Sequence, residues 1–110
     1  MICNTYVKFF THLADPTKLE VIKALREKPL CVSDLVQETS MEQSRVSHTL
    51  RKLKEAGFVH VKPNGKQRIY EIDAITIKPL LNLIDKHVDS YYRHYCHCKG
   101  TVRKQRWRNA

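Results

Sequence analysis

Long apolar runs, glycine and proline are all scarce in this sequence. Its 110 residues include only 3 Gly and 4 Pro, and 42% are hydrophobic, which is typical of a folded, helix-rich chain and not of a disordered one. No apolar stretch approaches the roughly 20 residues of a membrane-spanning helix, and no export signal is visible at the N-terminus. We therefore expect no membrane partner.

The usual signatures of an enzyme are missing as well. The sequence has no Gly-rich phosphate loop, no paired carboxylates in a pocket-forming context and no nucleophile–base spacing. Its 4 Cys come without a signal peptide, and two of them form a Cys-x-Cys sequence, so reduced thiols are expected rather than disulfides. These features predict a cytoplasmic protein that is not an enzyme.

Acidic residues are outnumbered by basic ones. The chain has 20 Lys plus Arg against 11 Asp plus Glu, and its net charge of +9 is typical of proteins whose partner is a polyanion. We expect residues 1–98 to form one domain and residues 99–110, which contain no acid, to form a basic tail. That tail is either a solvated end or an arm that follows a nucleic-acid backbone, with Trp107 as a stacking surface.

Helical spacing of apolar residues dominates the chain. It predicts helices over residues 2–13 and from Pro16 onward, with Asp15 as the N-cap of the second and Pro16 at its first position. A short helix is expected from Ser33, which would cap it, and a long helix is expected over residues 75–98. The sequence is therefore mainly α-helical.

The most informative stretch is SMEQSRVSHTLRKLKEAGF. Ser40 and Gln43 have the form of a capping box, apolar residues keep one face of the helix, and Gly57 ends it in the left-handed conformation. The other face carries only hydrogen-bonding and cationic side chains, namely Gln43, Ser44, Arg45, Ser47, His48, Arg51 and Lys52. Such a face suits contact with a polyanion.

After Gly57 the apolar period changes from helical to two, which predicts a β-hairpin made of FVHVK and QRIYEI. Asn64 and Gly65 between them are the pair favoured where both turn residues have positive φ. Basic residues mark the hairpin, namely Lys62, Lys66 and Arg68. The predicted fold class is mainly α with a small β-hairpin, a winged helix-turn-helix.

This order of elements suits duplex DNA, because the second helix of such a motif fits the major groove and the hairpin reaches the backbone beside it. The residues expected to face base edges or nearby phosphates are Gln43, Ser44, Arg45, Ser47 and His48. Those expected to hold the backbone are Lys52, Lys62, Lys66 and Arg68. A winged helix that docks on a protein complex is the alternative.

Four segments together resemble the ArsR/SmtB family of small transcriptional repressors: LADPTKLEVIKAL, CVSDL, SRVSHTLRKLKEAGFV and RIYEI. The resemblance covers most of residues 11–90. It implies a winged-helix homodimer in which the first and last helices form the interface. It also implies repression that is relieved by metal ions or metalloids, although some members of the family sense other signals.

Aromatic residues near both ends of the chain favour the same dimer. The core of so short a chain is too small to cover these side chains. They therefore either pack on another chain or form a large exposed apolar patch. They are Tyr6, Phe9, Phe10, Tyr91, Tyr92 and Tyr95. One two-fold interface would cover them all.

The metal sites that the resemblance implies are incomplete here. The family's thiol site has the pattern Cys-Val-Cys-Asp-Leu on the short helix, and this chain reads CVSDL, so Cys31 is kept and Ser33 replaces the second thiol. The family's zinc site on the last helix uses an Asp, two His and a Glu, whose positions are occupied here by Ala74, Thr76, His87 and Ser90. Only His87 is kept, so we expect no zinc site there.

Soft ligands gather instead in the stretch HYCHC, residues 94–98. Helical residues two apart point about 200° away from each other, so two thiols at that spacing bind one ion only where the helix unwinds, which Gly100 permits. The predicted ligands for zinc, cadmium or As(III) are Cys96 and Cys98, then Cys3, with His94 or His97 as its substitute. A thiol redox switch, an effector-independent DNA-binding regulator, and structural zinc in a protein-interaction module stay open as alternatives.

Overall fold

A computed structural model of the chain describes residues 2–95, with side chains from residue 4 onward. It divides into two compact units, Met1–Asp73 and Ala74–Ala110, and each is described by itself. Within residues 2–95, no helix has both the length and the apolar character needed to cross a membrane. The basic tail, residues 99–110, lies outside the described residues, so the expected boundary at residue 98 stays a prediction.

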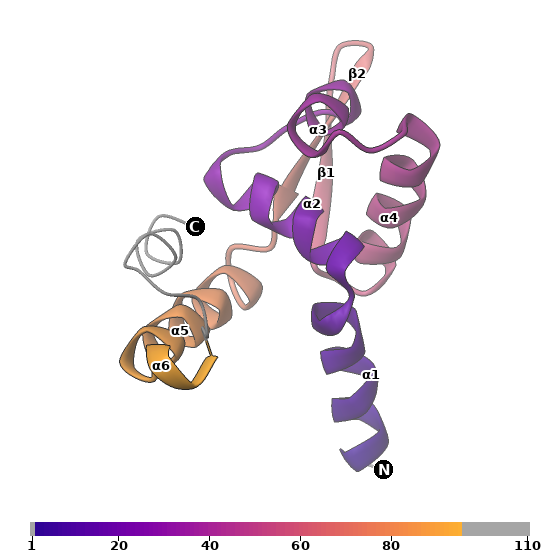
Figure 1. Ribbon diagram of the computed structural model, residues 1–110. Coiled ribbons are helices and arrows are strands. Elements are labelled where there is room, and N and C mark those ends of the chain that lie inside the picture. The colour runs from indigo at the N-terminus through magenta and orange to yellow at the C-terminus, as the bar shows by residue number, and fades with distance from the viewer. Residues whose placement is uncertain (1, 96–110) are drawn as a thin grey trace. The chain divides into compact units, whose positions relative to one another are not determined.

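The first unit is a winged helix-turn-helix, as predicted. It contains α1 (Ile2–Ala14), α2 (Pro16–Glu27), α3 (Val32–Thr39), α4 (Gln43–Glu55) and the antiparallel strands β1 (Val59–Asn64) and β2 (Gln67–Ile72) (Figure 1). Its largest fully buried side chains come from α2, α3, α4 and the start of the hairpin, namely Val21, Ile22, Leu25, Leu35, Val46, Leu50, Leu53, Phe58 and Val59. Their burial fixes which face of α4 remains outside.

Local sequence signals determine the start of α2 and the end of α4, both of which sequence analysis located correctly. Asp15 caps α2, where its Oδ1 accepts a hydrogen bond from the Thr17 backbone N–H at 3.0 Å. Gly57 follows α4 with a φ of +81°, and the Phe58 N–H donates to the Leu53 carbonyl at 2.9 Å. This is the Schellman arrangement, in which a left-handed glycine lets the chain turn back and satisfies the last carbonyls.

The predicted start of α3 is wrong by two positions. Its N-cap is Cys31, whose backbone N–H donates to Asp34 Oδ2 at 3.4 Å, so Ser33 lies inside the helix. An acidic residue at the third helical position can satisfy a free amide at the helix start, and here Asp34 does so without a hydroxyl at the cap.

The predicted capping box at the start of α4 is also wrong. Ser40 closes α3 in the left-handed conformation with a φ of +61°, and its N–H donates to the Val36 carbonyl at 2.9 Å. The Thr39 hydroxyl oxygen accepts from the Met41 N–H at 3.3 Å, which stabilises the turn. The chain therefore needs two further residues before α4 can begin, and Glu42 is its N-cap.

The hairpin forms where expected, but its turn differs. Asn64 pairs with Gln67, so the turn residues are Gly65 and Lys66, and of these only Gly65 has a positive φ, +66°. Glycine at the first turn position suits a type II′ turn, which matches the twist of the strands as well as the Asn-Gly turn would. Leu30 and Tyr70 exchange backbone hydrogen bonds of 3.0 and 2.8 Å and so anchor β2 to the segment before α3.

The second unit shows an interrupted helix where sequence analysis predicted a continuous one. α5 (Ile77–Ser90) ends at Tyr91, whose φ of −114° is not helical, and α6 (Tyr92–Tyr95) follows. The Ser90 hydroxyl donates to the Lys86 carbonyl at 3.1 Å. A side chain that bonds back to the preceding turn in this way competes with the helical hydrogen bonds and favours a bend.

His12 fixes α1 against the core and makes this contact sensitive to pH. Its ring lies 5.6 Å from that of Phe58, Phe9 stacks on the same ring at 5.2 Å, and the buried Nδ1 atom of His12 has no hydrogen-bond partner among the described residues. Burial lowers the pKa of His12 from its ordinary value of 6.5, and the positive charge of Lys18 adds to the effect. The carboxylate of Asp15 opposes it, and Lys52 lowers the pKa further.

We expect the free energy of unfolding to fall as the pH falls below 6.5, because the unfolded chain then binds a proton that the folded chain resists. The lowered pKa of His12 means that its contribution is fully present above 6.5 and is lost as the pH falls through the folded-state value. His12→Gln should flatten this slope in urea titrations at several pH values. His94→Gln, at an exposed position, is the matched control, and an unchanged slope in His12→Gln would contradict the assignment.

Candidate nucleic-acid interface

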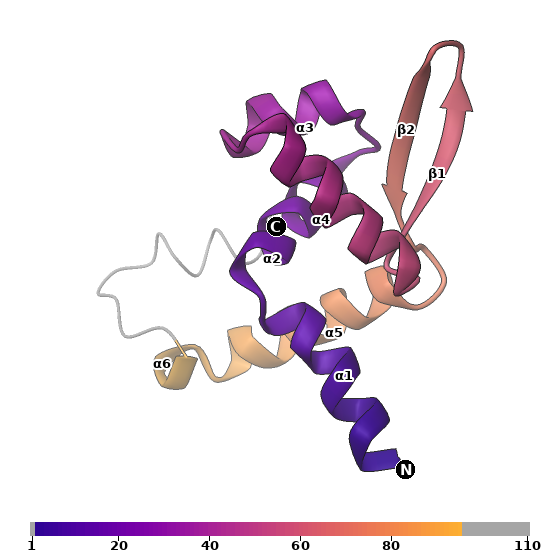
Figure 2. The same ribbon diagram turned by 90° about the vertical axis from the view of Figure 1, so that its right-hand side faces the viewer.

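One face of α4 remains outside because the other is built into the core. Val46, Thr49, Leu50 and Leu53 are buried, whereas all six residues predicted on α4 to contact DNA are exposed. These six are Gln43, Ser44, Arg45, Ser47, His48 and Lys52. Only residues 56–58 separate α4 from β1, so the helix and the hairpin follow each other within the first unit (Figure 2).

The Arg45 side chain is held from a distant part of the sequence. Its Nη2 donates a hydrogen bond of 2.9 Å to Oγ1 of Thr17, in the first turn of α2. Sequence analysis missed Thr17, because a contact between residues 28 positions apart leaves no periodic signal in the chain. Arg45 is therefore both exposed and oriented.

His48 and Arg51 form a second contact on the same face. Arg51 Nη2 lies 3.1 Å from His48 Nδ1, and because arginine only donates, His48 Nδ1 must accept. The proton of the neutral imidazole then lies on Nε2, which turns a donor away from the pair. Such a donor can reach a base acceptor or a phosphate oxygen.

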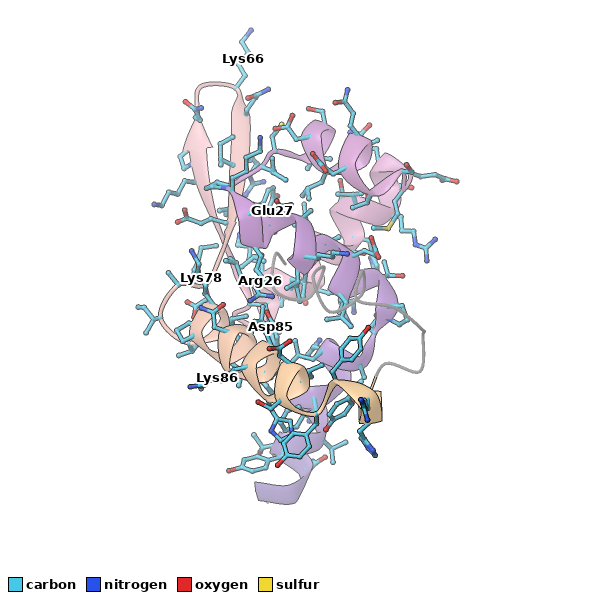
Figure 3. The ribbon with its side chains drawn as sticks, turned by 60° about the vertical axis from the view of Figure 1, so that its left-hand side comes forward. Arg26, Glu27, Lys66, Lys78, Asp85 and Lys86 are labelled. Carbon is cyan, nitrogen blue, oxygen red and sulfur yellow. The ribbon has the colours of Figure 1, made fainter. Side chains whose placement is uncertain are left out.

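The three predicted cations of the hairpin differ in their surroundings. Lys62 Nζ forms an ion pair with Glu71 Oε1 at 2.9 Å across the strands, so its charge is partly compensated. Lys66 and Arg68 are exposed, and the described residues offer neither of them an ion pair. Figure 3 shows Lys66 extending outward from the hairpin turn. The positive charge of the hairpin that no ion pair compensates is therefore concentrated near its turn.

Most of the predicted metal ligands lie outside the described part of the chain. This holds for Cys96, His97 and Cys98, and also for the side chain of Cys3. His94 is exposed, with its ring 4.9 Å from that of Tyr95. Among the described residues, no group of three or more His, Cys, Asp or Glu side chains could hold an ion.

The thiol of Cys31 is already engaged in hydrogen bonds. Its Sγ lies 3.2 Å from Ser33 Oγ and donates to Asp34 Oδ2, also at 3.2 Å. Cys31 is buried at the start of α3. These contacts give it a structural part at the N-cap.

Comparison with known proteins identifies the family. A family profile described as "Bacterial regulatory protein, arsR family" matches residues 15–61. The regulator Rv0081 of Mycobacterium tuberculosis is 32% identical over 80 residues, which make up 72% of this chain and 70% of that protein. The chain belongs to the arsR family. The arsR family consists of DNA-binding regulators of transcription, and the relatives of this chain are regulators and not enzymes.

Relatives of this arsR-family chain include named repressors. A transcriptional repressor SmtB homolog of Synechocystis is 35% identical over 86 residues, which span 78% of this chain but only 57% of the relative. The arsenical resistance operon repressor of Staphylococcus xylosus is 27% identical over 77 residues, 70% of each chain. The chain therefore spans little more than half of the length of the SmtB homolog.

Solved structures agree with the fold of this arsR-family chain. The crystal structure of Rv0081 has a TM-score of 0.77 and 28% identity, and covers 84% of this chain and 94% of that one. The homodimeric winged helix-turn-helix DNA-binding domain Mb0332 of Mycobacterium bovis has a TM-score of 0.75 and 21% identity, with 89% and 91% covered. At that identity the second comparison supports the fold alone.

Proposed function

We propose that this arsR-family regulator is a cytoplasmic, homodimeric repressor that binds duplex DNA and releases it when a thiophilic metal ion or metalloid binds. The observation that carries the DNA-binding part is the outward face of α4, which is polar and cationic, followed in the same unit by a hairpin with uncompensated charge at its tip. The proposed dimerisation rests on the exposed face of α1. The proposed response to an ion rests on the soft ligands near the C-terminus.

Side-chain chemistry indicates which of these residues contact bases and which contact the DNA backbone. Arg45 and Gln43 can each make two hydrogen bonds to one base, arginine to guanine and glutamine to adenine. Ser44, Ser47 and His48 supply single hydrogen bonds to bases or phosphates. The expected backbone contacts come from Lys52, Lys62, Lys66 and Arg68, of which Lys62 contributes least because Glu71 already pairs with it.

The experiment that tests DNA binding is selection from a random duplex library by the purified full chain, followed by affinity measurements over a range of salt concentrations. We expect one enriched sequence with two-fold symmetry, and an affinity that falls linearly with the logarithm of salt concentration. If no sequence is enriched and the chain does not bind random duplex at low salt, the protein-interaction alternative takes its place.

Dimerisation is supported by an apolar face on α1. Tyr6, Val7 and Phe10 lie on neighbouring positions of the helix and are 61%, 58% and 54% exposed. Figures 1 and 2 show that α1 projects away from α2, α3 and α4, so these elements of its own unit do not cover that face. A second copy of the chain would bury it, and the resemblance to the ArsR/SmtB family assigns α1 to such an interface.

The proposed effector site uses Cys96 and Cys98 as its main ligands, Cys3 as the third, and His94 or His97 as the substitute. Two thiolates with a third soft or borderline ligand suit zinc, cadmium or As(III). An arsenical resistance repressor among the relatives supports this class of effector. Cys31 stays outside the site, because its thiol is buried and hydrogen-bonded to Ser33 and Asp34.

Titration of the reduced chain with zinc, cadmium and arsenite should raise thiolate–metal absorption in the wild type and not in the Cys96→Ser, Cys98→Ser double variant. Cys31→Ser is the matched control and should respond like the wild type. Because linkage is reciprocal, saturating DNA should weaken the ion's affinity by the same factor by which the ion weakens DNA binding. Identical curves for wild type and double variant would remove the site, and loss of response only in Cys31→Ser would move it to α3.

A further inference from the structure

The contact between Arg45 and Thr17 joins two elements that the sequence keeps far apart. Arg45 lies in the first turn of α4, and Thr17 is the second residue of α2. Arg45 Nη2 donates to Thr17 Oγ1 at 2.9 Å, although Arg45 is exposed and a free arginine side chain would adopt many rotamers in water. A lasting contact at such a position orients the guanidinium.

We propose that Thr17 is a positioning residue for DNA recognition: it holds the Arg45 guanidinium in place, and thereby determines how sharply the regulator distinguishes the base pair that Arg45 reads. This inference rests on the proposed function, since it assigns α2 a part in the specificity of α4. Thr17 itself need not contact the DNA.

Thr17 is well suited to hold another side chain still. Its own backbone N–H is fixed by the 3.0 Å hydrogen bond to Asp15 Oδ1, and Pro16 precedes it at the helix start. Threonine branches at Cβ, which restricts its χ1 angle, and Thr17 is half-buried. The hydroxyl oxygen therefore has few positions available to it relative to α2. The helices α2 and α4 pack against each other, and Val21 and Val46 are among their buried residues.

The contact leaves Arg45 able to read a base. A guanidinium has five N–H donors in a rigid plane, and the hydrogen bond to Thr17 occupies one of them. Two of the remaining donors are sufficient for a bidentate contact with guanine O6 and N7. Because the orientation is set before binding, less side-chain entropy is lost when the DNA arrives.

The test compares Thr17→Val with Thr17→Ser in the full chain, using the duplex that the wild type enriches from a random library. Valine keeps the shape and β-branching of threonine but lacks the hydroxyl, whereas serine keeps the hydroxyl. We expect Thr17→Val to weaken that duplex on the order of 3- to 10-fold and to flatten the preference at one base pair of each half-site, with little change on random duplex. Thr17→Ser should restore most of both properties.

A double-mutant cycle shows whether Thr17 acts through Arg45. In an Arg45→Ala background, Thr17→Val should have no further effect on affinity or on base preference. Thermal unfolding of both Thr17 variants measures any purely structural role. Three results would overturn the inference: wild-type affinity and base preference in Thr17→Val, an equal loss in the Arg45→Ala background, or a loss in Thr17→Val that serine does not restore. Failure of the wild type to enrich any duplex would instead overturn the proposed function itself.

Discussion

Replacement of Arg45, Lys66 and Arg68 together by alanine should reduce affinity for the enriched duplex by on the order of a thousandfold or more. Arg45→Ala alone should cost about 1–3 kcal/mol and relax the preference at one base pair, because it removes a base contact. Lys66→Ala should weaken all duplexes alike and lower the salt slope by about 1, because it removes a phosphate contact. Fluorescence anisotropy over a range of salt concentrations measures both the affinity for DNA and its dependence on salt.

The matched control for this variant removes the same charge from other elements. Lys8, Lys23 and Lys28 are also exposed but belong to α1, α2 and the residue after α2. Their triple alanine variant lowers the net charge equally, so a general electrostatic attraction would weaken both triple variants to the same extent. Equal affinities of the wild type and the Arg45, Lys66 and Arg68 variant would remove the groove assignment.

The parts of the fold that could be predicted are those with a strong local cause. Asp15 followed by Pro16 starts a helix by its own chemistry, and Gly57 ends one because glycine adopts a positive φ at little cost. The polar face of α4 could be predicted for a related reason. Once apolar periodicity assigns Val46, Leu50 and Leu53 to the core, geometry places the remaining side chains outside.

The errors occur where several local solutions have similar free energies. Ser40 can open one helix or close the one before it, and the structure uses it to close α3. Asn64-Gly65 and Gly65-Lys66 both make two-residue turns, and strand register decides between them. The interruption at Tyr91 is not marked by proline or glycine. Apolar residues keep their helical spacing across it, so the sequence predicts one continuous helix.

Contacts between distant residues were beyond sequence reasoning altogether. The hydrogen bond from Arg45 to Thr17 and the ion pair between Lys62 and Glu71 depend on how α2 packs on α4 and on strand register. Each contact changes how much a predicted DNA-binding residue is expected to contribute to binding. Arg45 is held in place, and the charge of Lys62 is partly neutralised. Periodicity can identify a face of a helix, but only the packed chain shows which side chains on it are already engaged.

Replacement of Phe10 by lysine should convert the dimer into folded monomers and remove high-affinity binding to a two-fold symmetric duplex. Phe10 is 54% exposed in the single chain, so the substitution places no charge in the core of its own protomer. In the proposed dimer the same ammonium group would be left among apolar side chains, at a cost of several kcal/mol. Sedimentation velocity measures the oligomeric state, and circular dichroism measures whether the monomer keeps its helices.

Two further variants separate dimerisation from folding and from charge. Asn4→Lys adds the same charge on an exposed part of α1 about 120° around the helix from the Phe10 position, and should leave the dimer intact. Phe9→Ala removes a ring that stacks on Phe58 at 5.2 Å, so it should lower the free energy of unfolding. A Phe10→Lys chain that remains dimeric at micromolar concentration would exclude the exposed face of α1 from the interface. The exposed residues of α1 would then need another partner, because Tyr6 and Val7 beside Phe10 form an apolar surface that the described elements of its own unit leave open.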